Sequence, residues 1–140
     1  VFDFPFTVGT TDLIGMFMYL TDLFKAYRDS SIGSFSTDRV TLTRSGEGVA
    51  IEMSCWLAPY DLGISQRVKM EAIPMEVKGL YRIQVTLERR SGEADSWYRQ
   101  NRRFLTTLRK RFLIWRMFDG EIKTKYEVRG KELLGEVARA

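Results

Sequence analysis

The alternation of apolar and polar side chains between residues 39 and 89 is the feature that most constrains the fold. Four runs share this period of two: RVTLTR (39–44), VAIEMSCWL (49–57), QRVKMEAI (66–73) and LYRIQVTLER (80–89). Each run has the length of a β-strand, and the short connections between them predict an antiparallel meander. Clean alternation is typical of a sheet with one face on a core and the other in water. Another part of the chain must therefore cover the apolar face.

The apolar positions define the side of each strand that should face inward. We assign these residues to the core side: Val40, Leu42, Val49, Ile51, Met53, Cys55, Leu57, Val68, Met70, Ala72, Tyr81, Ile83, Val85 and Leu87. Polar residues such as Glu52 and Glu88 fall on the other side, and Trp56 lies with them. SGEG at 45–48 has the composition of a hairpin turn.

Two segments have the helical period. Between residues 13 and 27 one broad apolar face consists of Leu13, Met16, Phe17, Leu20, Leu23, Phe24 and Tyr27. The second segment is WYRQNRRFLTTLRKRFLIWR (97–116), and its core face consists of Trp97, Phe104, Leu105, Leu108, Phe112 and Trp115, with Asn101 among them. We expect Asp95 or Ser96 to cap it.

The two ends of the chain carry weaker patterns. VFDFPFT (1–7) is apolar but contains Pro5, and we interpret it as an extended lead-in to the first helix. The segment 118–120 predicts a break after the second helix. A weaker final helix should follow from Glu121 to the end, interrupted by Gly130 and Gly135.

The order of these elements predicts a two-layer α+β fold. It comprises an N-terminal helix, a four-stranded antiparallel meander, a long C-terminal amphipathic helix and a weaker final helix, in a single domain over residues 1–140. The two apolar helix faces are the covers that the sheet needs. A helix followed by a four-stranded meander resembles the cystatin or NTF2-like arrangement, a likeness of fold that carries no function. Because the first residue is Val1 and not Met, we expect a longer chain around this domain.

Charge is distributed unevenly along the chain. Residues 1–95 carry 10 basic and 13 acidic side chains, whereas residues 96–140 carry 12 basic and 5 acidic ones. The excess of positive charge is concentrated opposite the core face of the 97–116 helix, in a set that we call the basic face: Arg99, Arg102, Arg103, Arg109 and Lys110. Such an asymmetry suggests an anionic partner.

Three interpretations of the basic face remain open. In the first interpretation, the basic face is a solvated surface whose charges pair with acidic side chains elsewhere in the chain: Glu88, Glu93, Asp95, Glu121 and Glu127. Alternatively, it lies on an anionic membrane surface, where each Lys or Arg contributes about 1 kcal/mol. The third interpretation is nucleic-acid binding, which is disfavoured because the helix's aromatic residues share the core face and the chain has no RRM, KH, helix-turn-helix or zinc-finger signature.

The end of the same helix is apolar on every side. Leu113, Ile114, Met117 and Phe118 cover the positions that the core face leaves open. We expect the final helix, a second copy of the chain, another segment of the same protein or lipid to bury them. These four residues are therefore a candidate interface, and the chain is a candidate homo-oligomer.

Catalytic signatures are absent from the sequence. There is no histidine, which excludes most acid–base triads and zinc sites, and no nucleotide-binding or nucleophile motif. Cys55 should be an inert buried thiol. Solvated outward residues are the better interpretation of Glu52, Glu71 and Glu88, and a plain turn that of the loop at 58–65. We expect no catalytic, cofactor or metal site.

These observations predict a non-catalytic binding or assembly domain of a larger, membrane-associated protein. A single cysteine forms no intrachain disulfide and fits a cytoplasmic location at the membrane, and no run reaches the 18 apolar residues of a membrane-spanning helix. Two alternatives stay open: a nucleic-acid-binding domain that uses the basic face, and a small-ligand or enzymatic domain with a pocket between sheet and helix.

Overall fold

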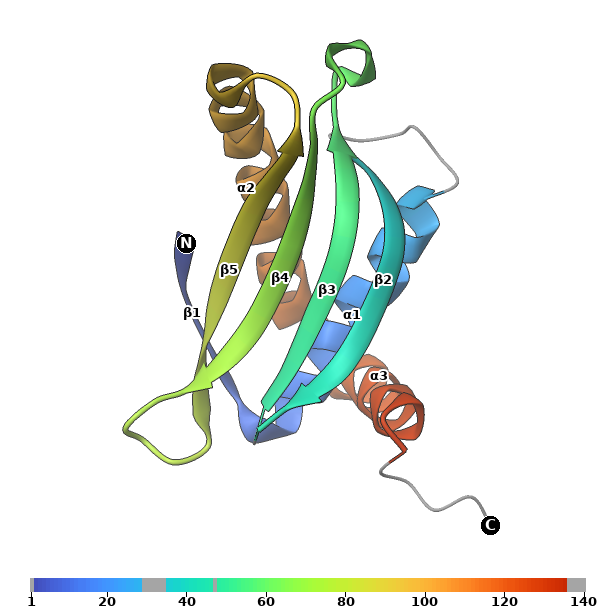
Figure 1. Ribbon diagram of the computed structural model, residues 1–140. Coiled ribbons are helices and arrows are strands. Elements are labelled where there is room, and N and C mark those ends of the chain that lie inside the picture. The colour runs from blue at the N-terminus through green and yellow to red at the C-terminus, as the bar shows by residue number, and fades with distance from the viewer. Residues whose placement is uncertain (1, 29–34, 47, 136–140) are drawn as a thin grey trace.

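A five-stranded antiparallel sheet forms one layer of the molecule, and helices cover one of its faces (Figure 1). This computed structural model describes residues 2–28, 35–46 and 48–135. The elements in chain order are β1 (Phe2–Gly9), α1 (Thr10–Arg28), β2 (Phe35–Ser45), β3 (Gly48–Leu57), a short 3₁₀ turn (Tyr60–Leu62), β4 (Ser65–Pro74), β5 (Leu80–Ser91), α2 (Ala94–Met117) and α3 (Gly120–Leu133). The predicted α+β class is confirmed.

The strand count differs from the prediction by one. Strands β2 to β5 are the four predicted runs, and neighbours along the chain pair with each other. Residues 1–7, predicted as an extended lead-in, instead belong largely to β1, which pairs antiparallel with β5 at the sheet edge. Pro5 obscured this strand in the sequence. It lies where the register shifts between Phe4 and Thr7, on an edge strand that tolerates a missing N–H donor.

Helix α1 spans the apolar face of the sheet because of the strand order β1-β5-β4-β3-β2. Its two neighbours in sequence, β1 and β2, are the two edges, so the chain must cross the whole sheet between them (Figure 1). The side chains that fill the space between helices and sheet include Phe17, Phe24, Leu108, Phe112, Ile51, Met53, Ile83 and Val85, all buried. The inward register predicted for β3, β4 and β5 is confirmed.

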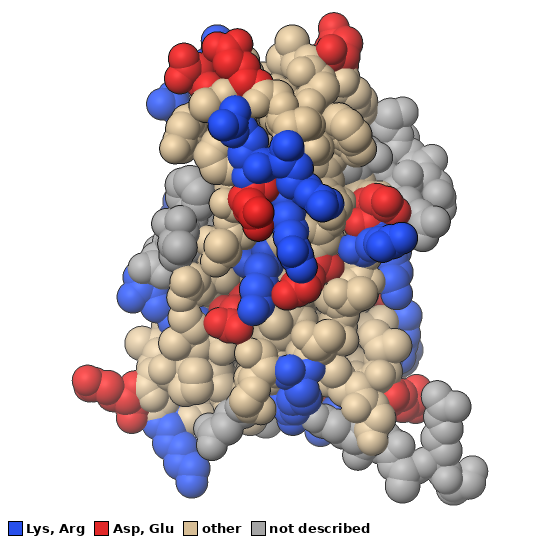
Figure 2. Space-filling model, in the orientation of Figure 1, with Lys and Arg blue, Asp and Glu red and all other residues tan. Residues whose placement is uncertain are grey.

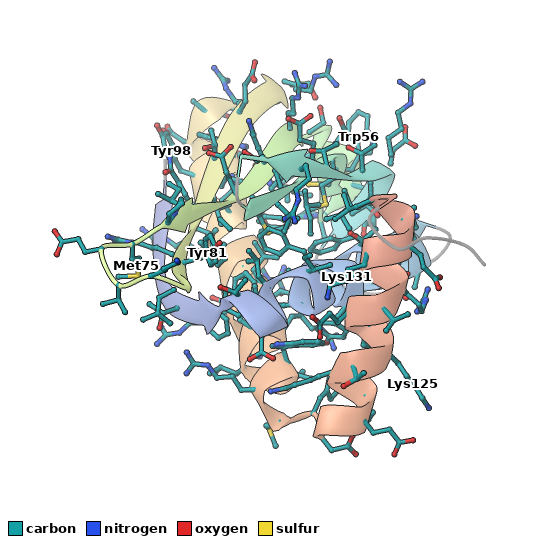
Figure 3. All side chains as sticks on the ribbon, turned by 90° about the horizontal axis from the view of Figure 1, so that it is seen from below. Trp56, Met75, Tyr81, Tyr98, Lys125 and Lys131 are labelled. Atoms are coloured by element: carbon teal, nitrogen blue, oxygen red, sulfur yellow. The ribbon has the colours of Figure 1, made fainter. Side chains whose placement is uncertain are left out.

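Helix α3 packs on the side of α1 that faces away from the sheet (Figure 3). Gly15 and Gly130 make this close approach possible: a Cβ atom on Gly130 would lie 2.6 Å from Ile14 Cγ2, and one on Gly15 would lie 3.2 Å from the backbone of α3. An ion pair of 2.6 Å between Arg129 and Asp22 joins the same two helices. The glycines that weakened the helix prediction are therefore packing positions.

The helix ends correct one prediction and confirm another. Glu93 is the N-cap residue of α2 without a side-chain hydrogen bond, so the predicted cap at Asp95 or Ser96 is wrong. The predicted break after α2 is confirmed: Asp119 caps α3 by accepting a hydrogen bond from the N–H of Ile122 at 2.9 Å. Helix α3, the predicted final helix, ends at Leu133. The predicted end of the first helix at 29–33 and the last residues, 136–140, lie outside the described residues.

Candidate functional site: the outer face of helix α2

The sheet fixes which side of α2 faces outward. The residues of α2 that are buried recur at helical spacing: Trp97, Asn101, Phe104, Leu108, Phe112 and Trp115. Trp97 anchors the start of the helix by donating from Nε1 to Oε1 of Gln66 on β4 at 2.8 Å. Phe112 stacks on Phe6 of β1 with ring centroids 5.0 Å apart. With this side held on the sheet, the opposite side of α2 must face away from the molecule.

The structure brings all five residues of the basic face together on that outer side. Arg99, Arg102, Arg103, Arg109 and Lys110 are all exposed. Among the described residues, no carboxylate lies within 4.0 Å of Arg102, Arg103, Arg109 or Lys110. Arg102, Arg103 and Lys110 also line an open depression of about 290 Å³ together with Thr106 and Thr107. The face is therefore a continuous positive surface that its own neighbours leave unneutralised.

The acidic residues that could have paired with this face do not all remain available to it. Glu121 lies 3.8 Å from Lys125, and Glu127 lies 3.1 Å from Lys131, both within α3. Asp95 lies in the first turn of α2, where a negative charge interacts favourably with the helix dipole. Arg99 itself donates a hydrogen bond from Nη2 to the hydroxyl of Ser96 at 3.4 Å.

The four residues of the candidate interface separate into two pairs. Leu113 and Met117 are 47% and 83% exposed, and they continue the outer face of α2 beyond Lys110. Ile114 and Phe118 instead pack against the core. The ring of Phe118 meets those of Tyr19, Trp115 and Tyr126 at centroid distances of 5.1 to 6.4 Å, so α1, α2 and α3 converge on one aromatic cluster.

The aromatic side chains of α2 contribute little to its outer face. Trp97, Phe104, Phe112 and Trp115 are buried, as the helical wheel predicts. Tyr98 is the exception with an exposed fraction of 60%, near the start of the helix (Figure 3). Sequence reasoning did not single it out, although its helical position relative to Arg102 and Arg109 was a usable signal.

The structure also defines the surroundings of the residues that were considered for chemistry. Cys55 is buried, and burial raises the pKa of its thiol from 9.0 to about 12, against the smaller opposing effect of a hydrogen bond from Gln66. Glu52 and Glu71 both contact Lys69, and Glu52 also contacts Arg67, so they form ion pairs across the open sheet face. The described residues contain no group of three acidic or cysteine side chains that could hold a metal ion.

The loop at 58–65 connects β3 to β4. It contains the 3₁₀ turn, and the hydroxyl of Tyr60 is buried without a hydrogen-bond partner in the described chain. Burial is the main cause that raises the pKa of Tyr60, and the charge of the nearby Cys55 raises it further.

Within the described residues, no helix is long and apolar enough to cross a membrane. No protein family, curated protein or solved structure gives a match to this chain.

Proposed function

We propose that this chain is a non-catalytic binding domain of a membrane-associated protein, and that the outer face of α2 docks on an anionic membrane surface. The observation that carries the proposal is the set of exposed basic side chains on one side of one helix, unneutralised by the described acids. Each Lys or Arg held at an anionic leaflet contributes about 1 kcal/mol at physiological ionic strength. Five such residues on a rigid helix meet the surface together, without the entropy cost of ordering a flexible segment.

The apolar end of the same face favours lipid over nucleic acid. Leu113 lies three and four residues after Lys110 and Arg109, and Met117 lies one turn further, so both share the outward direction of the basic face. Exposed Leu and Met side chains can enter the boundary between headgroups and acyl chains. Nucleic acid offers no comparable environment, and on α2 it would find one exposed ring, that of Tyr98, for base stacking.

Cosedimentation with vesicles tests the proposal. The wild-type chain should bind vesicles that contain phosphatidylserine, and not vesicles of phosphatidylcholine alone. Binding should fade as salt is raised from low to physiological ionic strength and beyond, since the charges are exposed and screened. The triple variant R99Q/R103Q/K110Q should lose most of this binding while keeping its melting temperature, because these side chains have no role in the core.

A matched control separates the face from the total charge. The variant K25Q/K78Q/K125Q makes the same charge change at three exposed positions on α1, the β4–β5 connection and α3. It should keep nearly all vesicle binding. Equal losses in the two variants would mean that net charge, and not this face, drives association. A chain that ignores vesicles but binds duplex or single-stranded nucleic acid through the same residues would replace the membrane proposal with the nucleic-acid one.

A further inference from the structure

The uncovered face of the sheet contains a hollow of about 270 Å³, on the opposite side of the molecule from the outer face of α2. Its outward-facing lining comprises Asp38, Arg39, Ser54, Trp56, Ser65 and Arg90. An adjoining depression shares Arg39, Ser54 and Arg90 with it and adds Arg67 together with its ion-pair partner Glu52. Figure 2 views this face and shows basic side chains in a band along the sheet, with acidic side chains beside them.

Charge pairing divides this band into two parts. Arg67 and Lys69 lie within 3.5 to 3.9 Å of Glu52, and Lys69 lies 3.5 Å from Glu71. Arg39 and Arg90 have no carboxylate within 4.0 Å among the described residues. The hollow therefore has two guanidinium groups whose charge is not neutralised by direct contact, although the carboxylate of Asp38 is part of the same lining.

The hydroxyl groups of the lining differ in what they can donate. Ser54 Oγ accepts a hydrogen bond from Arg90 at 3.3 Å, which leaves its own proton free to donate. Ser91 donates to the carbonyl of Gly63 at 2.8 Å, so Ser65 must donate in the 2.6 Å contact between the two serine hydroxyls. Arg39, Arg90 and Ser54 are accordingly the donors that an oxyanion in the hollow would meet.

The backbone of β2 is distorted in a way that directs Arg39 to this face. The partner of Asp38 is Ser54 and that of Thr41 is Glu52, so β2 holds one residue more than β3 between these pairs. Counted forward from Asp38, strict alternation would turn residue 39 toward the core, whereas counted back from the inward Val40 it would turn that residue outward. The bulge keeps Arg39 in the lining of the hollow. The φ angle of Arg39 is 51°, a left-handed backbone conformation that residues other than Gly rarely adopt. Strained residues of this kind cluster at binding sites.

Trp56 adds a flat apolar surface to the same lining. Its side chain is 47% exposed on the side of the sheet away from α1 and α3 (Figure 3). Trp97 and Trp115 are buried in the core, so Trp56 is the accessible tryptophan of the chain. An indole beside two guanidinium groups suits a ligand that carries a planar ring next to an anionic group.

We propose that this hollow binds a phosphate monoester that adjoins an aromatic ring, as in an aryl phosphate or a nucleoside monophosphate. The phosphate oxygens lie between Arg39 and Arg90 and accept a hydrogen bond from Ser54, while the ring stacks on Trp56. Asp38 restricts the affinity because its carboxylate repels the dianion. The site is separate from the outer face of α2 and does not depend on its function.

Isothermal titration and tryptophan quenching test the site with three probes: phenyl phosphate, adenosine monophosphate and inorganic phosphate. Phenyl phosphate should bind saturably at low salt and protect Trp56 from neutral acrylamide, and inorganic phosphate should bind more weakly. The comparison with adenosine monophosphate shows whether a nucleobase is accepted in place of a phenyl ring. R90Q and R39G should each weaken phenyl phosphate about tenfold, the size expected for one charge-assisted hydrogen bond. R39G retains the fold because Gly adopts a positive φ readily.

Two further variants make the test specific. D38N should tighten phenyl phosphate, since it removes the like charge and keeps the side-chain shape. R99Q/R103Q/K110Q on α2 should bind the probe as the wild type does. The proposal is overturned if none of the three probes binds at millimolar concentration, if R39G and R90Q bind like the wild type, or if the α2 variant is the one that loses binding. Equal affinity for phenyl phosphate and inorganic phosphate would overturn the role given to Trp56.

Discussion

At the scale of single residues, the alternation of apolar and polar side chains predicts which residues face the core but not which residues form a site. The alternation in β3 correctly placed Cys55 toward the core, because one residue of slip would have turned the whole apolar set of the strand outward. The same pattern turns Arg39 outward with Thr41, because Val40 and Leu42 face inward, but it does not identify Arg39 as a site residue. Its left-handed backbone and the shared outward direction of Asp38 and Arg39 depend on an extra residue in β2, and a bulge can be recognised only when the partner strand is known. Trp56 was placed outward, but nothing in its run of sequence indicated that Arg39 and Arg90 would lie around it.

The burial of Cys55 predicts an alkaline effect on stability. The thiol has a pKa of about 12 in the folded chain against 9.0 when solvated, so its contribution is fully present below pH 9 and is lost as the pH rises from 9 toward 12. In this window the unfolded state loses the proton first, which lowers the free energy of unfolding by about 1.4 kcal/mol per pH unit. Urea unfolding at several pH values should give C55A a shallower alkaline slope than the wild type. Parallel slopes, or rapid labelling of the native thiol at pH 8, would contradict the burial.

At the scale of elements, the helix faces were predictable and the helix contacts were not. A helical wheel identifies the core side of α2 because six buried residues recur at its period. It says nothing about Gly15 and Gly130, which lower helix propensity when each is considered alone. Their role in packing follows from the contact between α1 and α3, where the absence of a Cβ atom lets the two helix backbones approach closely. The strand β1 was missed for a related reason, since its partner β5 lies about 80 residues away in the chain.

The contact between α1 and α3 predicts different effects of an added Cβ atom at two glycines of α3. Gly130→Ala places a Cβ 2.6 Å from Ile14 Cγ2, and the β-branched side chain has little freedom to move away. Overpacking of this kind costs about 1–3 kcal/mol, more than the gain in helix propensity. Gly120→Ala meets nothing within 4 Å and should be neutral or slightly stabilising. Thermal unfolding should therefore show a lower melting temperature for Gly130→Ala and an unchanged or slightly higher one for Gly120→Ala. A Gly130→Ala variant that melts above the wild type would exclude the close packing.

At the scale of the whole molecule, the basic residues form two separate surfaces: the outer face of α2 and part of the open face of the sheet. The sequence shows only an uneven distribution of charge along the chain. Counting charges located the excess in the C-terminal third, and the helical period placed it on one side of α2. The sheet brings together a second basic region from residues that are far apart in the chain, such as Arg39 and Arg90. A count of charges along the sequence does not reveal this region, because the acidic residues Glu52 and Glu71 lie on the same face of the sheet. Only the folded arrangement shows that these two regions point in opposite directions.

This separation predicts how the chain lies on a membrane. In a C55A background, a cysteine at Leu113 on the outer face of α2 can carry a polarity-sensitive label, and Thr43, exposed on the open sheet face, provides the matched position. With phosphatidylserine vesicles, the label at 113 should shift to shorter wavelength because it enters the interface, and the label at 43 should stay in water. Trp56 should remain accessible to acrylamide in the bound state, since it lies on the side of the sheet away from the helices. A shift at 43 with none at 113, or shielding of Trp56 by vesicles, would show that the sheet and not α2 faces the lipid.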